Sequence, residues 1–214
     1  MRITRAIAIS AVVLGAAAAS AGAVVQHHHG SADGSGEYGQ SMAGMKMSAS
    51  ASQAVALPAA QLAKARLATA KYANDLGAAK AAGYSILTKR IAGMGYHYIN
   101  PKIKGFDVTK PPILVYEKHG SSWQLGALEW VFTSKPATPP LKGATYGSFP
   151  AACQYADGTF VPQADSTSCA PTNAQSGAKF TFWHPKLVTM HVWEWYPNPS
   201  GIYASMNPLV SAFG

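Results

Sequence analysis

The chain contains 214 residues and carries a formal net charge of +8, although only 12% of its residues are charged. Its Lys and Arg residues are scattered and form no long basic run, which argues against a nucleic-acid-binding protein. Because of its net positive charge, we expect the protein to associate weakly with anionic surfaces of the cell envelope.

The N-terminal segment, residues 1–23, has the pattern of a secretory signal peptide. Arg2 and Arg5 precede an apolar stretch, and small residues then offer cleavage after Ala21 or after Ala23. The apolar stretch is shorter than a comfortable transmembrane span, so we favour a cleaved signal over an uncleaved anchor. The sequence therefore predicts a secreted or periplasmic protein.

Residues 24–57 are rich in Gly, Ser and Ala and contain few large apolar side chains. Such a segment cannot bury enough apolar surface to offset the loss of chain entropy, so we predict a disordered tail. The tail also contains soft and borderline metal ligands of the kind that copper handling needs. These ligands are His27, His28, His29, Met42, Met45 and Met47. A metal-scavenging arm and an unselective linker are both compatible with this composition.

Residues 58–214 are predicted to form one α+β domain. Pro58 suits the first turn of a helix and Gly83 suits its end, and apolar residues between them recur at helical spacing. Beyond Gly83, short β-branched and aromatic runs alternate with Pro and Gly, which is typical of antiparallel strands. Strands are expected at residues 96–99, 113–117, 124–132, 179–183 and 188–196, with a turn at residues 119–122. The expected fold is an N-terminal helix packed on an antiparallel β-sheet or a partly closed barrel.

A long segment rich in Pro, Gly and Ser, residues 134–178, is predicted to be a loop that covers the functional site. It contains the two cysteines of the chain, Cys153 and Cys169. An even number of cysteines in an exported protein favours a disulfide over a redox or metal-binding pair. The bridge would close a loop of about 17 residues and stabilise the fold by roughly 3 kcal/mol.

Two histidines and two glutamates fall on strand faces that otherwise look buried. They are His97, Glu117, Glu129 and His191. Because a buried carboxylate is unfavourable unless it is paired or bound to a metal, these four side chains are expected to meet. They would then form either a structural core of His–Glu pairs or a site for Zn, Cu, Fe or Mn. His184 and Glu194 are possible additional ligands, although Glu194 would point away from His191 in a strand.

No motif in the sequence fixes a reaction. It contains no nucleophile elbow, no Gly-rich phosphate loop and no HExxH zinc motif. We therefore favour an exported, non-enzymatic binding protein whose ligand the sequence does not identify, with a transition metal bound through His and Glu residues as one candidate. A metal-assisted envelope hydrolase and a purely structural or interaction domain are the alternatives.

Three stretches together resemble a group of small secreted bacterial proteins of unassigned function. These stretches are residues 93–98 (GMGYHY), residues 114–117 (LVYE) and residues 191–199 (HVWEWYPNP), the last running on to Asn207 and Pro208. The resemblance covers about residues 65–210 and excludes the tail. It implies a single exported domain with an N-terminal helix and supplies no catalytic residues.

Overall fold

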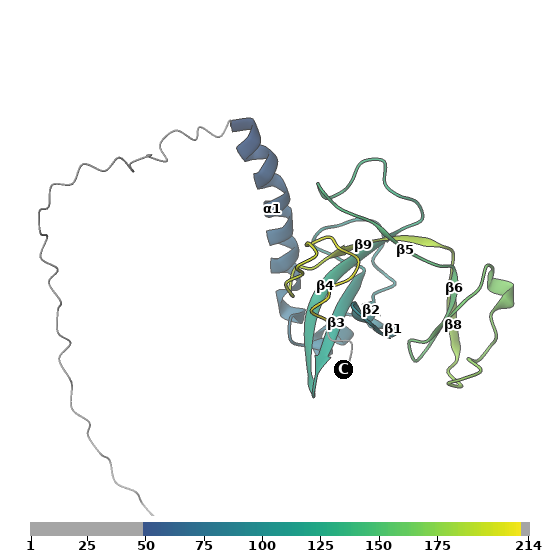
Figure 1. The fold of residues 1–214 in the computed structure, drawn as a ribbon. Helices are drawn as coiled ribbons and strands as arrows, with labels where there is room; N and C mark the ends of the chain where they lie inside the picture. The colour runs from purple at the N-terminus through teal and green to yellow at the C-terminus, as the bar shows by residue number, and fades with distance from the viewer. Residues whose placement is uncertain (1–48, 211–214) are drawn as a thin grey trace, which may run out of the picture. The chain divides into compact units, whose positions relative to one another are not determined.

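The protein is built mostly from β-strands, as the computed structural model shows for residues 49–210, with side chains described for residues 58–210. Nine strands form a larger sheet, curled into a half-barrel, and a separate smaller sheet (Figure 1). The predicted α+β class with an N-terminal helix is therefore wrong. Strands dominate the described residues, and the longest helix among them, α1 (Ala49–Thr69), begins well inside the chain.

The larger sheet contains six strands and the smaller sheet three. The six strands are β1 (Ser85–Ile91), β2 (Gly95–Ile99), β3 (Ile113–His119), β4 (Ser122–Phe132), β5 (Gly147–Phe149) and β9 (Leu187–Val192). Their order is β1-β2-β3-β4-β9-β5, and all neighbours are antiparallel. The smaller sheet has the order β7-β6-β8, with β6 at Ala152–Tyr155, β7 at Phe160–Pro162 and β8 at Phe180–His184.

Several predicted strands are confirmed, and one is shorter than predicted. The strands expected at residues 96–99, 113–117 and 124–132 correspond to β2, β3 and β4, and His119 pairs with Ser122 across the predicted turn. The strand expected at residues 188–196 ends at Val192. The segment predicted as a loop, residues 134–178, contains β5, β6 and β7, and its disulfide joins Cys153 to Cys169 as predicted.

The predicted helix from Pro58 to Gly83 begins earlier, at Ala49, so that Pro58 lies inside it, and the helix is then interrupted. After α1 the chain forms a short 3₁₀ turn at Ala70–Tyr72 and then α2 at Leu76–Ala81. Asp75 caps α2, because its side chain accepts a hydrogen bond from the backbone N–H of Ala78 at 2.8 Å. No helix of the described part of the chain is both long and apolar enough to span a bilayer.

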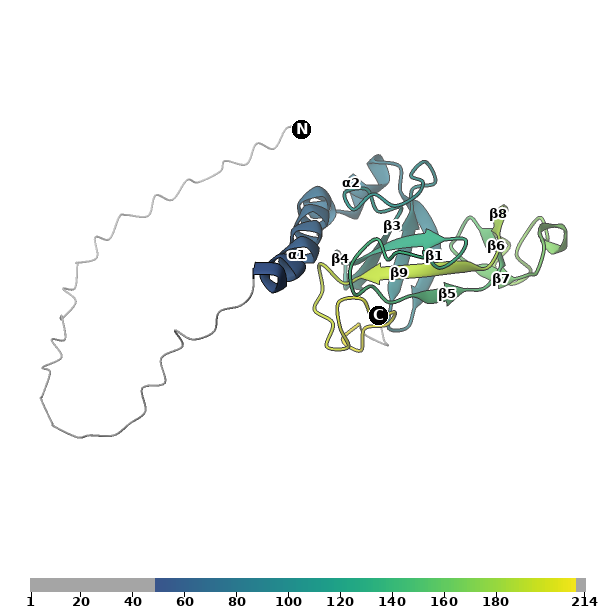
Figure 2. The ribbon, with the colours of Figure 1, turned by 90° about the horizontal axis from the view of Figure 1, so that it is seen from above.

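The two faces of the larger sheet have different roles. One face packs on α1 and α2 through a core that includes Leu128, Trp130, Met190 and Val192. Figures 1 and 2 show α1 on this side of the sheet and the smaller sheet on the other. Because side chains alternate along a strand, the neighbours of these core residues point into the half-barrel instead. That inner face carries the candidate site.

Candidate metal centre

Strands β2, β4 and β9 each place one polar side chain on the inner face. Glu129 on β4 pairs directly with His191 on β9. His97 lies on β2, which is separated from β4 by β3, and it pairs with Val115 of β3. The curl of the sheet brings the imidazole of His97 back toward Glu129. The three side chains are almost fully buried, with 2–4% of each residue exposed.

The distances between the three side chains are suited to a shared metal ion. Glu129 Oε2 lies 3.6 Å from His97 Nε2, and Glu129 Oε1 lies 3.6 Å from His191 Nε2. The three residues offer ligand atoms that all lie within 4.8 Å of one another. A hydrogen bond would require about 2.7–3.2 Å. Two ligands on a tetrahedral ion with bonds of about 2.1 Å lie roughly 3.4 Å apart, which is close to the observed spacing.

The second nitrogen of each imidazole distinguishes the two histidines. His97 Nδ1 lies 2.8 Å from Thr88 Oγ1, a distance at which an Nδ1–H donates to the hydroxyl and leaves the Nε2 lone pair free. His191 has no hydrogen-bond partner at either ring nitrogen, although both atoms are buried. A buried polar atom without a partner is unfavourable by about 1–3 kcal/mol. A ligand on His191 Nε2 would remove part of that penalty.

Burial shifts the pKa values of all three groups toward their neutral forms. It raises the pKa of Glu129 to about 8 and lowers that of His191 to about 4. It also lowers the pKa of His97 to about 3, with a further contribution from repulsion by His191. The 3.6 Å separations fall within ion-pair range, yet these shifts favour an uncharged triad in the protein alone. A divalent cation reverses this preference because it binds the carboxylate form.

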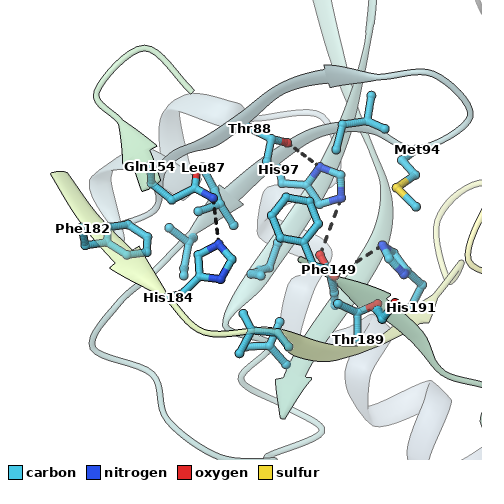
Figure 3. A pocket seen from close by; sticks show the side chains of 17 residues that line it. Leu87, Thr88, Met94, His97, Phe149, Gln154, Phe182, His184, Thr189 and His191 are labelled. Carbon is cyan, nitrogen blue, oxygen red and sulfur yellow. Dashed lines mark hydrogen bonds and ion pairs between the residues drawn. The ribbon is translucent and has the colours of Figure 1, made fainter. Parts of the chain in front are cut away.

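The triad lines a cavity of about 180 Å³ between the two sheets. Figure 3 shows His97, His191 and Met94 on one side of this cavity and Gln154, His184 and Phe182 on the other. Most of the remaining wall is aliphatic or aromatic: Leu87, Ile91, Ile99, Ile113, Val131, Phe149 and Leu187. The site thus combines three potential metal ligands with an apolar chamber.

Glu117, which was predicted to join the other three residues, lies elsewhere on the sheet. It is buried, as expected, but it pairs with Gln124 near the end of the β3–β4 hairpin. Arg90 Nε donates to Glu117 Oε1 at 3.1 Å, so the carboxylate has its own cation. The group of potential ligands found among the described residues contains His97, Glu129 and His191 without it.

The two additional candidates are also separate from the triad. His184 is buried on the opposite side of the cavity, where its Nε2 lies 3.0 Å from Gln154 Nε2. Glu194 follows β9 and faces Arg66, whose Nη1 lies 3.8 Å from its carboxylate and also donates to its backbone carbonyl. The tail residues His27, His28, His29, Met42, Met45 and Met47 lie outside the described residues.

Two residues of the site were missed by sequence reasoning. Thr88 lies on β1, which was not predicted because its sequence, SILTKRI, contains two adjacent cations near its end and carries only a weak alternation. Gln154 lies on the four-residue strand β6, inside the segment taken for a loop. The sequence feature that could have indicated an ordered Gln154 is its position directly after Cys153, because a disulfide restricts the residues beside it.

No family model, curated protein or solved structure matches this chain. The resemblance to small secreted bacterial proteins therefore stays a prediction. What the site does chemically follows from its own residues: two imidazoles and one carboxylate, all buried, facing an apolar cavity.

Proposed function

We propose that this protein is an exported metal-binding protein that holds one first-row transition-metal ion through His97, Glu129 and His191. The observation that carries the proposal is the spacing of three buried ligand atoms, too wide for hydrogen bonds and suited to a common ion. The unpartnered imidazole of His191 and the raised pKa of Glu129 support it, because a cation would satisfy both groups.

The choice of metal follows from the ligands. Two imidazoles and a carboxylate are a set that Zn²⁺ and Fe²⁺ accept readily, and Mn²⁺ and Cu²⁺ are also compatible with it. Three protein ligands leave at least one coordination position for another molecule. Since all three residues line the cavity, that position would face the apolar chamber.

The open position also supports a metal-assisted enzyme as a second candidate, because catalytic zinc sites use three protein ligands. Binding is the better supported function. Among the described residues, the only ionisable side chain besides the triad that lines the cavity is His184, and its ring nitrogens contact Gln154 and the Pro185 carbonyl. This imidazole is therefore already engaged at both nitrogens and is not placed as a general base for water on the metal.

The proposal of export rests mainly on the N-terminal sequence. The pattern of residues 1–23 supports secretion or a periplasmic location, and the net charge of +8 supports weak association with anionic envelope surfaces. The disulfide between Cys153 and Cys169 agrees with an oxidising compartment.

The test is metal analysis by plasma mass spectrometry on the full chain, purified without a polyhistidine tag. About one equivalent of metal is expected in the wild type and almost none in Glu129→Gln or His191→Ala. Glu117→Gln is the matched control, since it changes another buried glutamate that lies outside the triad. Equal metal content in wild type, Glu129→Gln and His191→Ala would refute the proposal.

A second control separates the triad from the tail. In a full-length variant, the tail residues His27, His28 and His29 are changed to Ala and Met42, Met45 and Met47 to Leu. Metal retained in this variant but lost in His191→Ala would assign the ion to the triad. The opposite pattern would assign it to the tail and overturn the proposal.

A further inference from the structure

The cavity has a second polar end, on the smaller sheet. His184 Nδ1 lies 2.8 Å from the Pro185 carbonyl oxygen, so Nδ1 carries the hydrogen and donates. His184 Nε2 must then accept, and the group that lies 3.0 Å from it is Gln154 Nε2. This fixes the orientation of the Gln154 amide. Its oxygen, Oε1, is buried and has no hydrogen-bond partner.

The free amide oxygen matters because of where it lies. Gln154 is 1% exposed and lines the same cavity as the triad. A buried acceptor without a partner favours a ligand that donates a hydrogen bond. In Figure 3, Gln154 and His184 lie on the opposite side of the cavity from His97 and His191. A ligand between the two ends would meet a metal ion at one end and a hydrogen-bond acceptor at the other.

The middle of the cavity sets the size and polarity of such a ligand. Its volume is about 180 Å³, and Leu87, Phe149 and Leu187 are among the apolar residues that line it. An engineered cavity of about 150 Å³ with a similar lining binds benzene. The present cavity therefore has room for one ring with one or two small substituents.

The ligand also needs a way in. Phe182 lines the cavity and is nonetheless 39% exposed, so the cavity reaches the surface beside this residue. The triad residues, at 2–4% exposed, are far more enclosed. A molecule that enters past Phe182 would reach the open metal position only after passing the apolar walls.

We propose, resting on the metal site proposed above, that the cavity binds a single-ring aromatic acid or phenol that carries a hydroxyl or amino group. Its anionic oxygen ligates the metal held by His97, Glu129 and His191. Its ring fills the apolar middle, and its O–H or N–H donates to Gln154 Oε1. The interaction is non-covalent and leaves the ligand chemically unchanged.

The experiment uses the full chain loaded with Co²⁺, whose visible absorption reports directly on its coordination. Three probes are titrated by calorimetry and by absorption: benzoate, 3-hydroxybenzoate and 4-hydroxybenzoate. Each should change the Co²⁺ spectrum, and at least one hydroxybenzoate should bind about five- to tenfold more tightly than benzoate, as expected for one buried hydrogen bond.

Two variants locate the ligand. Gln154→Met has a similar volume without the amide oxygen, and it should abolish the preference for hydroxybenzoate while benzoate still binds. Leu87→Trp replaces an apolar lining residue by a much larger one and so reduces the cavity volume, while all three proposed metal ligands stay in place. It should bind Co²⁺ and none of the three probes. Loss of the preference in one variant and of all binding in the other would establish both parts of the site.

The possible failures are distinguishable. Failure of the wild type to bind Co²⁺ would overturn the metal site and this inference together. Co²⁺ binding without a response to any probe would overturn only the ligand proposal. A preference for hydroxybenzoate that survives in Gln154→Met would rule out Gln154 as the acceptor.

Discussion

Glu129 on β4 and His191 on β9 face each other across adjacent antiparallel strands, with 3.6 Å between Oε1 and Nε2. The backbone pairing alone thus places two of the three proposed ligands side by side. The third, His97, reaches the pair because the sheet curls. The arrangement depends on strand register, so the site should be preorganised before any ion binds.

Thr88 is expected to tune the affinity of this site. Its hydroxyl contacts His97 Nδ1 at 2.8 Å and so holds the tautomer that offers Nε2 to the ion. Thr88→Val should weaken metal binding by about 10- to 100-fold. Thr88→Ser, which retains the hydroxyl, is the control and should bind nearly as tightly as the wild type. Competition titration with a chromogenic chelator measures both, and equal affinities for Thr88→Val and wild type would contradict this role.

Metal-free protein should become less stable as the pH rises from about 6.5 to 8. Burial raises the folded pKa of Glu129 to about 8 from 4.5, so the folded state binds more protons than the unfolded state in this range. The pKa values of His97 and His191 are lowered from 6.5 to about 3 and about 4. Their effect has the opposite sign and levels off about one pH unit above 6.5, the pKa of the unfolded histidines, so it offsets part of the decline at the lower end of this range. At 1.36 kcal/mol per pH unit, Glu129 alone then lowers the free energy of unfolding by about 2 kcal/mol.

The measurement for this prediction is urea denaturation of chelator-treated protein at several pH values between 6.5 and 8. Glu129→Gln removes the titrating group and should give a flatter profile. Metal-loaded wild type should also lose the decline, because the bound carboxylate stays ionised. Parallel profiles for wild type and Glu129→Gln would show that Glu129 does not titrate in this range.

Loss of the disulfide should weaken ligand binding at the Gln154 end of the cavity more than it weakens metal binding at the triad. Cys153 is buried and immediately precedes Gln154 on β6, whereas the triad lies on the larger sheet. Replacing Cys153 and Cys169 together by Ala should lower the free energy of unfolding by about 3 kcal/mol. Metal affinity should remain close to that of the wild type, and the preference for hydroxybenzoate should fall. Urea denaturation and calorimetry on the same variant test both expectations, and a larger loss of metal than of ligand binding would contradict them.

Gly95 is expected to be irreplaceable for a steric reason. Its φ of +107° is one that other residues rarely adopt, and an added Cβ would lie 2.4 Å from the carbonyl oxygen of Tyr116. Gly105 has a φ of +71° and open space around it, so Gly105→Ala isolates the backbone strain, about 1–2 kcal/mol. Gly95→Ala should be clearly more destabilising and should weaken metal binding, since it displaces β2 two residues before His97. Thermal denaturation and metal titration test both variants. Equal melting temperatures and equal metal affinities for Gly95→Ala and Gly105→Ala would contradict this prediction.

Strand periodicity predicts which face a residue occupies but not its position along the sheet. It correctly places His97, Glu129 and His191 on buried faces, and it does the same for Glu117. It cannot show that Glu117 lies near the hairpin end, beside the cation of Arg90. Position along a strand depends on pairing with neighbours, which one sequence does not reveal.

A β-bulge explains a second error of the same kind. Simple alternation along residues 124–132 would put Leu125 on the face of Glu129, but Leu125 belongs to the same core cluster as Leu128, beneath the helices. The pairing passes from Val115–Ala127 to Tyr116–Leu125 and leaves Gly126 unmatched. On one side of the extra residue, each side chain therefore occupies the opposite face of the sheet from the one that simple alternation predicts. Gly126 was the only signal for this in the strand.

The fold class was mispredicted because the strands that complete it are short. β5 and β7 have three residues each and β6 has four, which is too few for an alternating pattern to stand out. Their pairing depends on distant partners: β5 on β9, and β6 on β8. The helix, in contrast, was predicted from local signals, Pro58 and Gly83, although Pro58 lies inside α1 and the segment is interrupted before Gly83.

The chain passes from β8 in the smaller sheet to β9 in the larger one through Pro185 and Lys186 alone. The face that His191 presents is set by the register of β9 against β4, and the short connection must fit that register. Inserting or deleting a single residue there would strain the connection unless β9 shifts by one residue, and that shift would turn the imidazole toward the helices even though every ligand would remain in the sequence. Homologous sequences that share this site should therefore vary in the identity of the two connecting residues but keep the spacing from His184 to His191 constant.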